Sequence, residues 1–203
     1  MSDQTKIQLL PSEMELVSSP DIILTKNAIL QKIKSFLEEI QSQQINILKN
    51  YADQLPPDIL KVSPKISRGE NYKGLPWMVL DNPRHFEHNN IFAIRNMFWW
   101  GNFFSITLHV SGRYKMFIQE KIFQKDLKSL NKDYLIYTGN DEWEHRIEQE
   151  VHKSLRAVDK KEFESIISKQ AFLKITLRIP IAPLRTIEDK LIAGFKDVIT
   201  LCI

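Results

Sequence analysis

A Gly101-Asn102 pair stands in the most aromatic part of this chain, between two runs rich in β-branched and aromatic residues. Glycine adopts a positive φ without steric cost and asparagine tolerates one, so the pair is typical of a two-residue hairpin loop. We therefore predict a central hairpin that pairs residues 91–100 with residues 103–111. A two-residue loop places Trp100 opposite Phe103 and Arg95 opposite Leu108.

This register sorts the side chains of the hairpin onto two faces, because successive residues of a strand point to opposite sides. One face is apolar except for Arg95 and is expected to meet the main core. The other face mixes large apolar groups with hydrogen-bonding ones: Phe92, Ile94, Asn96, Phe98, Trp100, Phe103, Ser105, Thr107, His109 and Ser111. Neither an exposed face nor a dry core normally has this composition. The mixed face predicts a ligand pocket or a protein interface, and a plain amphipathic face under a helical layer is the simpler alternative.

The rest of the chain predicts an α+β fold with a mainly antiparallel sheet of about five strands, packed by several helices. Besides the hairpin, the strands are expected at residues 77–80, 134–138 and 172–179. In the last of these, Lys174 and Thr176 alternate with apolar residues, which is typical of a half-exposed strand.

Helical spacing of apolar residues predicts four helices after the hairpin, the last two of them capped by Asp159 and Thr186. The first covers residues 113–130. The second is capped by Asn140 or Asp141 and has an inner side made of Trp143, Ile147, Val151 and Leu155. On that helix, His145 and His152 would lie on one face, as in a surface ladder of ion pairs.

The amino-terminal part divides at residue 25. Residues 1–24 are expected to form a tail or loop, and residues 25–203 a single α+β domain. Thr25 suits the N-cap of a long amphipathic helix over 25–55, which would be about 43 Å long if unbroken over 26–54. The polar block 41–44 is where it would break. An unbroken helix has an outer half free to pair with a second copy, so a homodimer is one expectation. The other is that the apolar side of the whole helix packs on the sheet of its own chain.

Turn-forming dipeptides predict that residues 63–90 are mostly a loop around the short strand 77–80. The loop carries several basic side chains, among them Arg68 and Arg84. If it folds over the hairpin, an anionic ligand would meet Arg84 or Arg68, because a guanidinium pairs well with a carboxylate or phosphate. Solvated charges on a connecting loop are the commoner explanation.

Arg95 requires a partner, because an unpaired charge on a core face is costly. Asp81 is the expected carboxylate, and the two would form a structural ion pair that fixes the preceding segment to the sheet; an anion-binding role for Arg95 is the alternative.

Known catalytic and metal-binding patterns are not found. The chain has no phosphate-binding glycine loop, no nucleophile elbow and no His-Glu-x-x-His, so no catalytic residue, metal or cofactor is predicted. Glu142 and His145 have the Glu-x-x-His spacing of a di-iron helix, but that site needs a second copy of the motif.

Two functional alternatives to a binding domain remain. An enzyme would use His109, provided that Glu70, Asp81 or His85 comes within hydrogen-bond reach of His109 or Thr107. A single-stranded nucleic-acid binder would use Trp77, Trp100 and Arg84 for stacking and phosphate contacts.

Composition narrows the function classes. The chain has 203 residues, a formal net charge of +3 spread without a basic run, and one cysteine, Cys202. These values do not indicate nucleic acid as a partner, and a single cysteine suits a reducing cytoplasm. Residues 91–110 are long enough to span a membrane, but the turn and the polar residues within them argue against it. We expect a cytoplasmic, non-catalytic domain that binds a small molecule, including an anionic one, or a protein on the mixed face.

Overall fold

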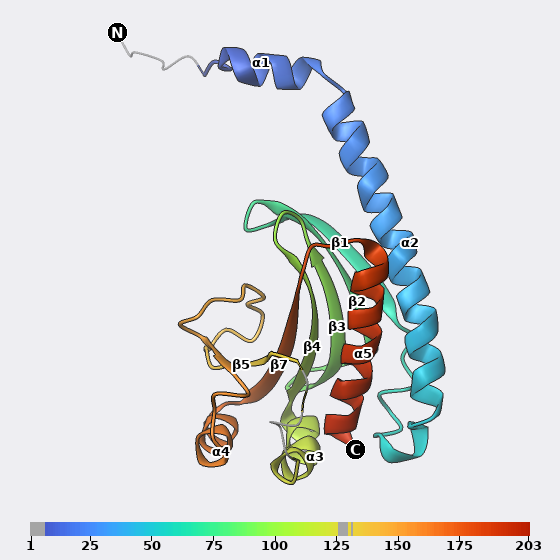
Figure 1. The fold of residues 1–203 in the computed structure, drawn as a ribbon, viewed down its shortest axis with the longest axis vertical. Coiled ribbons are helices and arrows are strands. Elements are labelled where there is room, and N and C mark those ends of the chain that lie inside the picture. Colours follow the sequence, from blue (N-terminus) through green and yellow to red (C-terminus); the bar gives the residue numbers. More distant parts are fainter. Residues whose placement is uncertain (1–6, 126–129, 131) are drawn as a thin grey trace.

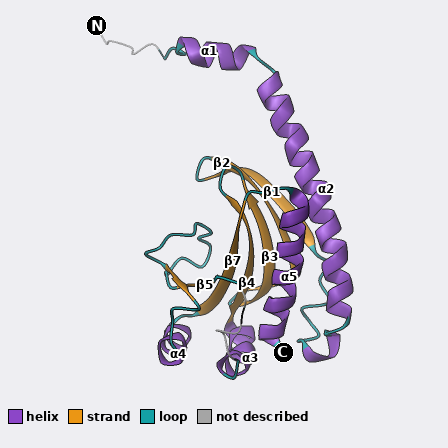
Figure 2. Ribbon diagram, in the orientation of Figure 1, coloured by secondary structure: helices purple, strands orange, loops and turns teal. Residues whose placement is uncertain are grey.

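The structure, a computed structural model, describes residues 7–125, 130 and 132–203 (Figure 1). It has a mixed α+β architecture built on an antiparallel sheet with the strand order β1-β2-β3-β4-β7-β5-β6. The strands are β1 (Lys65–Tyr72), β2 (Leu75–Glu87), β3 (Asn90–Trp99), β4 (Phe103–Ser111), β5 (Tyr134–Tyr137), β6 (His152–Ser154) and β7 (Phe172–Pro180). The helices are α1 (Pro11–Ser18), α2 (Asp21–Lys49), α3 (Gly112–Phe123), α4 (Lys160–Lys169) and α5 (Leu184–Cys202), with a 3-10 turn at Ala52–Gln54 (Figure 2).

The fold class and the antiparallel sheet agree with the sequence prediction, but the sheet has seven strands and not five. Residues 63–90 are not mostly loop: they contain β1 and β2. Of their turn signals, only Lys73-Gly74 reverses the chain, with positive φ at both residues. Gly69 lies inside β1 under the Trp77 indole, where an added Cβ would come within 2.5 Å of Nε1. The segment Asp81-Asn82-Pro83 forms an irregularity within β2, at a shift in the register with β3.

The amino-terminal prediction is also corrected. Residues 11–18, expected as loop, form α1, and Pro11 at its first turn is a favoured helix start. The long helix begins at Asp21, not at residue 25, and ends at Lys49. It does not break at 41–44, because Gln44 is buried there and its side-chain amide bonds to Asn96.

Two of the later helices also differ from the prediction. Helix α3 ends at Phe123, and residues 126–129 of the predicted helix 113–130 lie outside the described residues. The helix expected after residue 140 does not form, and residues 138–151 are irregular. One reason is that the Glu144 side chain accepts hydrogen bonds from the backbone N–H groups of His145 and Arg146. Such local bonds compete with helical ones.

The hairpin is present, but its loop has three residues, not two. Trp99 pairs with Phe103, and Trp100, Gly101 and Asn102 form the turn. The backbone N–H of Asn102 donates to the Trp99 carbonyl at 3.0 Å, and its side-chain amide donates to the Trp100 carbonyl at 2.8 Å. A shift of one residue turns one strand over relative to the other. Even-numbered residues of β3 therefore share a face with even-numbered residues of β4.

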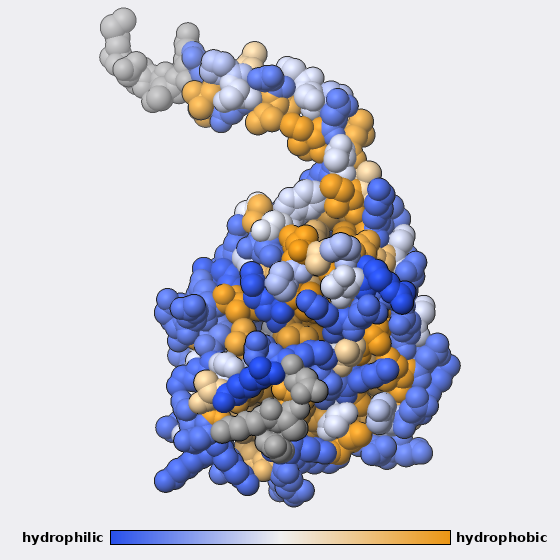
Figure 3. Space-filling model, viewed as in Figure 1, coloured by the Kyte–Doolittle hydropathy of each residue, from blue (hydrophilic) through white to orange (hydrophobic). Residues whose placement is uncertain are grey.

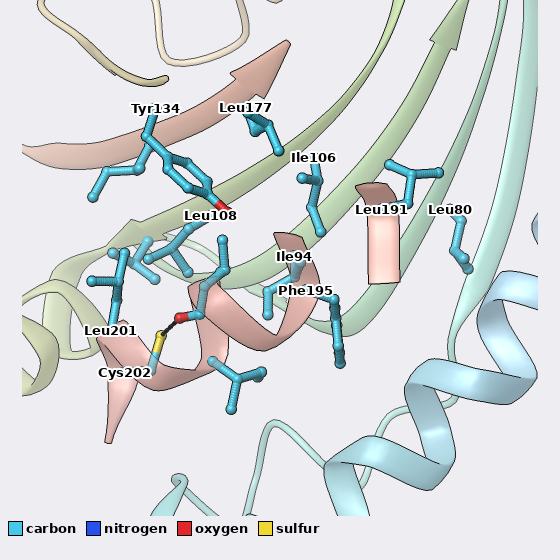
Figure 4. Close-up of a cluster of buried hydrophobic side chains, with 14 of the residues drawn as sticks. Leu80, Ile94, Ile106, Leu108, Tyr134, Leu177, Leu191, Phe195, Leu201 and Cys202 are labelled. Atoms are coloured by element: carbon cyan, nitrogen blue, oxygen red, sulfur yellow. Dashed lines mark hydrogen bonds between the residues drawn. The ribbon is translucent and has the colours of Figure 1, made fainter. Parts of the chain in front are cut away.

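That even-numbered face, the helix face, is covered by α2, α3 and α5 and holds the main core. Figure 4 shows Ile94, Ile106 and Leu108 of the sheet beside Phe195 and Leu201 of α5. Cys202 is buried there, donates to the Val198 carbonyl at 3.2 Å, and has its pKa raised to about 12 by burial. No helix within the described residues is both long and apolar enough to cross a bilayer.

Candidate functional site

The opposite face of the sheet, the loop face, is covered by residues 138–151 and carries the polar groups of the central strands. We call these residues the covering loop; Figure 1 shows them on the side of the sheet away from α2 and α5. Odd-numbered positions of β3 and β4 point to this face, where Arg95 bonds to His145 and His109 bonds to Glu142. A small apolar cluster at one end consists of Val79, Met97, Trp99 and Phe103.

The predicted mixed face is thus divided between two sides of the sheet. Phe103, Ser105, Thr107 and His109 lie on the loop face, and all four are buried. The other predicted members that lie in β3 are on the helix face: Phe92, Ile94, Asn96 and Phe98. Trp100 is in the turn and packs against the same core. The two-residue loop was wrong, and with it the grouping that depended on it.

Asn96 has a structural explanation on the helix face. Its side-chain oxygen accepts from the Gln44 amide at 3.0 Å, and its own amide lies within bonding distance of Gln44 and of the Leu80 carbonyl. Both amides are fully buried. Arg84, the predicted anion partner, donates from Nε to the Ser63 carbonyl at 2.7 Å.

Arg95 and Asp81 form the expected ion pair, but on the loop face. The guanidinium donates to both Asp81 oxygens, at 2.8 and 3.0 Å. It also donates from Nη1 to Nε2 of His145 at 2.9 Å. Since a guanidinium can only donate, Nε2 of His145 accepts and the ring proton is on Nδ1. Burial, followed by the positive charges of Arg95 and Lys174, lowers the pKa of His145 to about 2, so this ring is neutral.

His109 is 2% exposed and bonds through Nε2 to Glu142 Oε1 at 2.9 Å. Burial lowers the pKa of His109 despite the opposing effect of that bond. The same bond lowers the pKa of Glu142. The neutral imidazole therefore donates to an ionised carboxylate, and the Trp143 ring packs against it. This contact holds the covering loop to the middle of β4.

Lys174 of β7 holds the covering loop at a second point. Its ammonium donates to the backbone carbonyls of Glu142 and Glu144 and lies 4.8 Å from the centre of the Tyr137 ring. Burial, and then the charge of Arg95, lowers the pKa of Lys174 to about 8. Lys174 is 3% exposed, so the expected half-exposed strand is covered on both faces.

Glu144 holds the loop to the sheet edge. Its carboxylate accepts from the Tyr72 hydroxyl and from the Arg146 guanidinium. Burial alone would raise the pKa of Glu144, but the bonds from Arg146 and Tyr72 lower it to about 2. The Tyr72 hydroxyl in turn accepts from the His145 N–H at 2.7 Å.

A cavity of about 460 Å³ lies between the covering loop and strands β1 to β3. Its walls include Tyr72, Trp77 and Trp143, and its floor includes Asp81 and Arg95. The other lining residues are Ser67, Asn71, Val79, Met97 and His145. Aromatic walls around a few convergent polar groups are typical of small-molecule sites.

Several polar residues of the loop face have roles that the sequence does not indicate. Lys174, Glu142 and His145 look like surface residues in a one-dimensional pattern, because the covering loop that buries them has no regular period. One signal was present: Trp143 and His145 stand among acidic residues.

The pairing that the enzyme alternative requires is not among the hydrogen bonds of the described residues. His109 bonds to Glu142 and Thr107 to Thr176, rather than to the three residues proposed as partners. Glu70 bonds to Lys26 instead, and neither His109 nor Thr107 lines the cavity. Within the described ranges, no group of three His, Cys, Asp or Glu residues has the arrangement of a metal site.

The three residues of the nucleic-acid alternative do not share a surface. Trp77 lines the loop-face cavity, Trp100 packs on the helix-face core, and Arg84 is bonded to a backbone carbonyl. Comparisons with protein-family models, curated proteins and solved structures give no match to this chain.

Proposed function

We propose that the protein binds a small molecule in the loop-face cavity, with a flat ring against the aromatic wall and an acidic group at Arg95. The volume of about 460 Å³ suits such a ligand. Tyr72, Trp77 and Trp143 come from three different segments, so the wall depends on the complete fold and not on one motif.

Arg95 carries this proposal. A guanidinium has five N–H donors, and the bonds to Asp81 and His145 use three of them. Within the described residues, the other two have no hydrogen-bond partner, although Arg95 lines the cavity. A carboxylate or sulfonate matches the planar fork of a guanidinium better than a neutral group does.

Calorimetric titration with 8-anilinonaphthalene-1-sulfonate, a flat aromatic anion, tests the proposal. We expect one saturable site in the unaltered protein. Ser67→Trp places an indole in the cavity and should abolish that binding. Lys65→Trp is the matched control, because Lys65 is exposed on the same strand face but does not line the cavity. Equal binding to Ser67→Trp and Lys65→Trp would contradict the proposal.

A neutral analogue tests the acidic group separately. N-phenyl-1-naphthylamine keeps the rings but lacks the sulfonate, and we expect it to bind roughly tenfold more weakly because it loses a charge-assisted hydrogen bond. Equal affinities for the two probes would mean that the cavity binds only the apolar rings and that Arg95 does not contribute to binding. A variant with Leu16→Asp and Val17→Asp in α1 checks that the exposed amino-terminal helix does not bind the dye.

A further inference from the structure

The amino-terminal arm, residues 7–24, exposes a long row of apolar side chains. Nine large ones are at least half exposed: Ile7, Leu9, Leu10, Met14, Leu16, Val17, Ile22, Ile23 and Leu24. No residue of α1 is buried, and Figure 1 shows α1 beyond the end of the sheet. Figure 3 shows apolar side chains along α1 and the start of α2. An exposed apolar surface of this length is typical of an interaction site.

The charges of the arm limit what covers it. It contains three carboxylates, Glu13, Glu15 and Asp21, and no Lys, Arg or His. Anionic lipid headgroups would repel such a segment. The whole chain has a formal net charge of +3, so the residues outside the arm carry the positive excess. A second copy of this chain therefore offers charge complementarity to the arm.

A groove at the far end of α2 fits the arm in shape and charge. It has a volume of about 320 Å³ and contains two basic residues, Lys49 and Lys61, but no acidic one. The remaining lining is mostly apolar: Ile45, Leu48, Ala52, Ile59, Leu60, Val62, Ser63, Pro64, Asn82 and Pro83. We call it the α2-end groove. Apolar side chains of the arm would fill it while the carboxylates of the arm meet the two lysines.

Within one chain, α2 keeps the arm and the groove apart. The helix is continuous from Asp21 to Lys49, and Leu24 and Ile45 are separated by about 30 Å at 1.5 Å per residue. The short helix α1 cannot cover that distance. If two copies lie with their α2 helices antiparallel, each arm reaches the groove of the other copy. This arrangement has twofold symmetry and closes on itself.

We propose that two copies of the chain form a dimer by reciprocal docking of each arm, residues 7–24, in the α2-end groove of the other copy. The dimer does not depend on the ligand cavity, which lies on the opposite face of the sheet. The proposal also specifies which segment forms the homodimer expected from the sequence: the contact is made by the arm and not by the outer side of α2.

Sedimentation equilibrium of the full chain tests the proposal with two kinds of variant. The arm variant, Leu16→Asp with Val17→Asp, should be monomeric, because it places charges on the docked surface. The groove variant, Lys49→Glu with Lys61→Glu, should raise the dimer dissociation constant roughly tenfold or more. Ser12→Asp with Ser18→Asp adds the same charge to α1 without removing apolar surface, and this control should associate more strongly than the arm variant. All substituted positions are exposed, so circular dichroism should show unchanged folding.

Mixing the two variants distinguishes arm-to-groove docking from other contacts. The arm variant keeps an intact groove and the groove variant keeps an intact arm. A mixture should therefore form heterodimers that are tighter than the homodimers of either variant alone. A monomeric unaltered protein, an unchanged groove variant, or a mixture without heterodimers would overturn the proposal. Arm-dependent flotation with phosphatidylcholine–phosphatidylglycerol vesicles would also overturn it, in favour of a lipid surface.

Discussion

The two faces of the central sheet are covered by different means. On the helix face, three helices bury a continuous apolar core in which the uncharged side chains of Gln44 and Asn96 bond to each other. On the loop face, an irregular segment is held by charged and polar contacts, with Arg95, Lys174 and His109 as the anchors in the sheet. One face depends mainly on the hydrophobic effect, and the other on hydrogen bonds in which one partner or both are charged.

This difference indicates where the protein can accommodate a ligand. Close-packed apolar side chains leave little empty volume. A loop held by point contacts leaves space between them, and the cavity of about 460 Å³ lies in that space. The helix face therefore supplies stability, and the loop face also contains the proposed ligand site. Four sets of substitutions separate these contributions.

The largest expected effect comes from adjacent phenylalanines that point to opposite faces. Phe104 is buried against Phe36 and Phe98, so Phe104→Ala should lower the free energy of unfolding by about 4 kcal/mol. Phe103 belongs to the smaller loop-face cluster, and Phe103→Ala should cost roughly half as much, because that cluster can rearrange more easily. Urea denaturation measures both. A larger loss for Phe103→Ala would mean that the loop face carries the greater part of the stability.

The ion pair on the loop face should come next. Arg95→Met leaves the buried Asp81 carboxylate unpaired and should cost about 3 kcal/mol of unfolding free energy. Adding Asp81→Asn removes the unpaired charge and should recover at least half of that loss. Arg84→Met is the control, because Arg84 makes one exposed bond to a carbonyl. If Arg84→Met is as harmful as Arg95→Met, the pairing with Asp81 does not explain the effect.

The amide pair on the helix face should have a smaller effect. Asn96→Ala leaves the buried Gln44 amide without its main partner and should cost about 2 kcal/mol. Replacing both with apolar residues, Gln44→Met with Asn96→Leu, should restore most of the loss, since no ligand function depends on this pair. The same strategy on the loop face, Asp81→Asn with Arg95→Met, should restore stability but not binding of the naphthalene sulfonate. Recovery of dye binding in the latter variant would contradict the assignment of Arg95.

The two faces also differ in how well the sequence predicts them. The α+β class and the long helix could be predicted from apolar periodicity, and the central hairpin from its Gly101-Asn102 turn. The register could not, because Gly101-Asn102 is compatible with a two-residue and a three-residue loop, and the choice depends on packing on both sides of the sheet. Asn102 determines it locally by bonding to the Trp100 carbonyl, which no sequence pattern reveals.

The loop face was only partly predictable. The Arg95–Asp81 pair could be inferred because a charge inside an apolar strand requires a counter-charge. The partners of His109 and Lys174 could not, because Glu142 and Glu144 lie in a segment without regular structure, where spacing carries no geometric information. The apolar spacing in this segment predicts a helix, but residues 138–151 are irregular and cover the cavity instead.

The smallest effect concerns the pH dependence of the loop face. His145 is neutral in the folded protein, with a pKa lowered to about 2, and an unfolded histidine titrates near 6.5. Below about pH 6.5 the unfolded state therefore binds a proton that the folded state does not, and stability falls as the pH falls. His145→Gln removes this group, so between pH 6 and pH 5 the unaltered protein should lose roughly 1 kcal/mol more stability than the variant. The exposed His88 provides the control, and His88→Gln should retain the slope of the unaltered protein in urea denaturation at each pH. Parallel slopes for His145→Gln and the unaltered protein would mean that burial and Arg95 do not hold the His145 ring neutral, and that the covering loop is anchored mainly through His109 and Lys174.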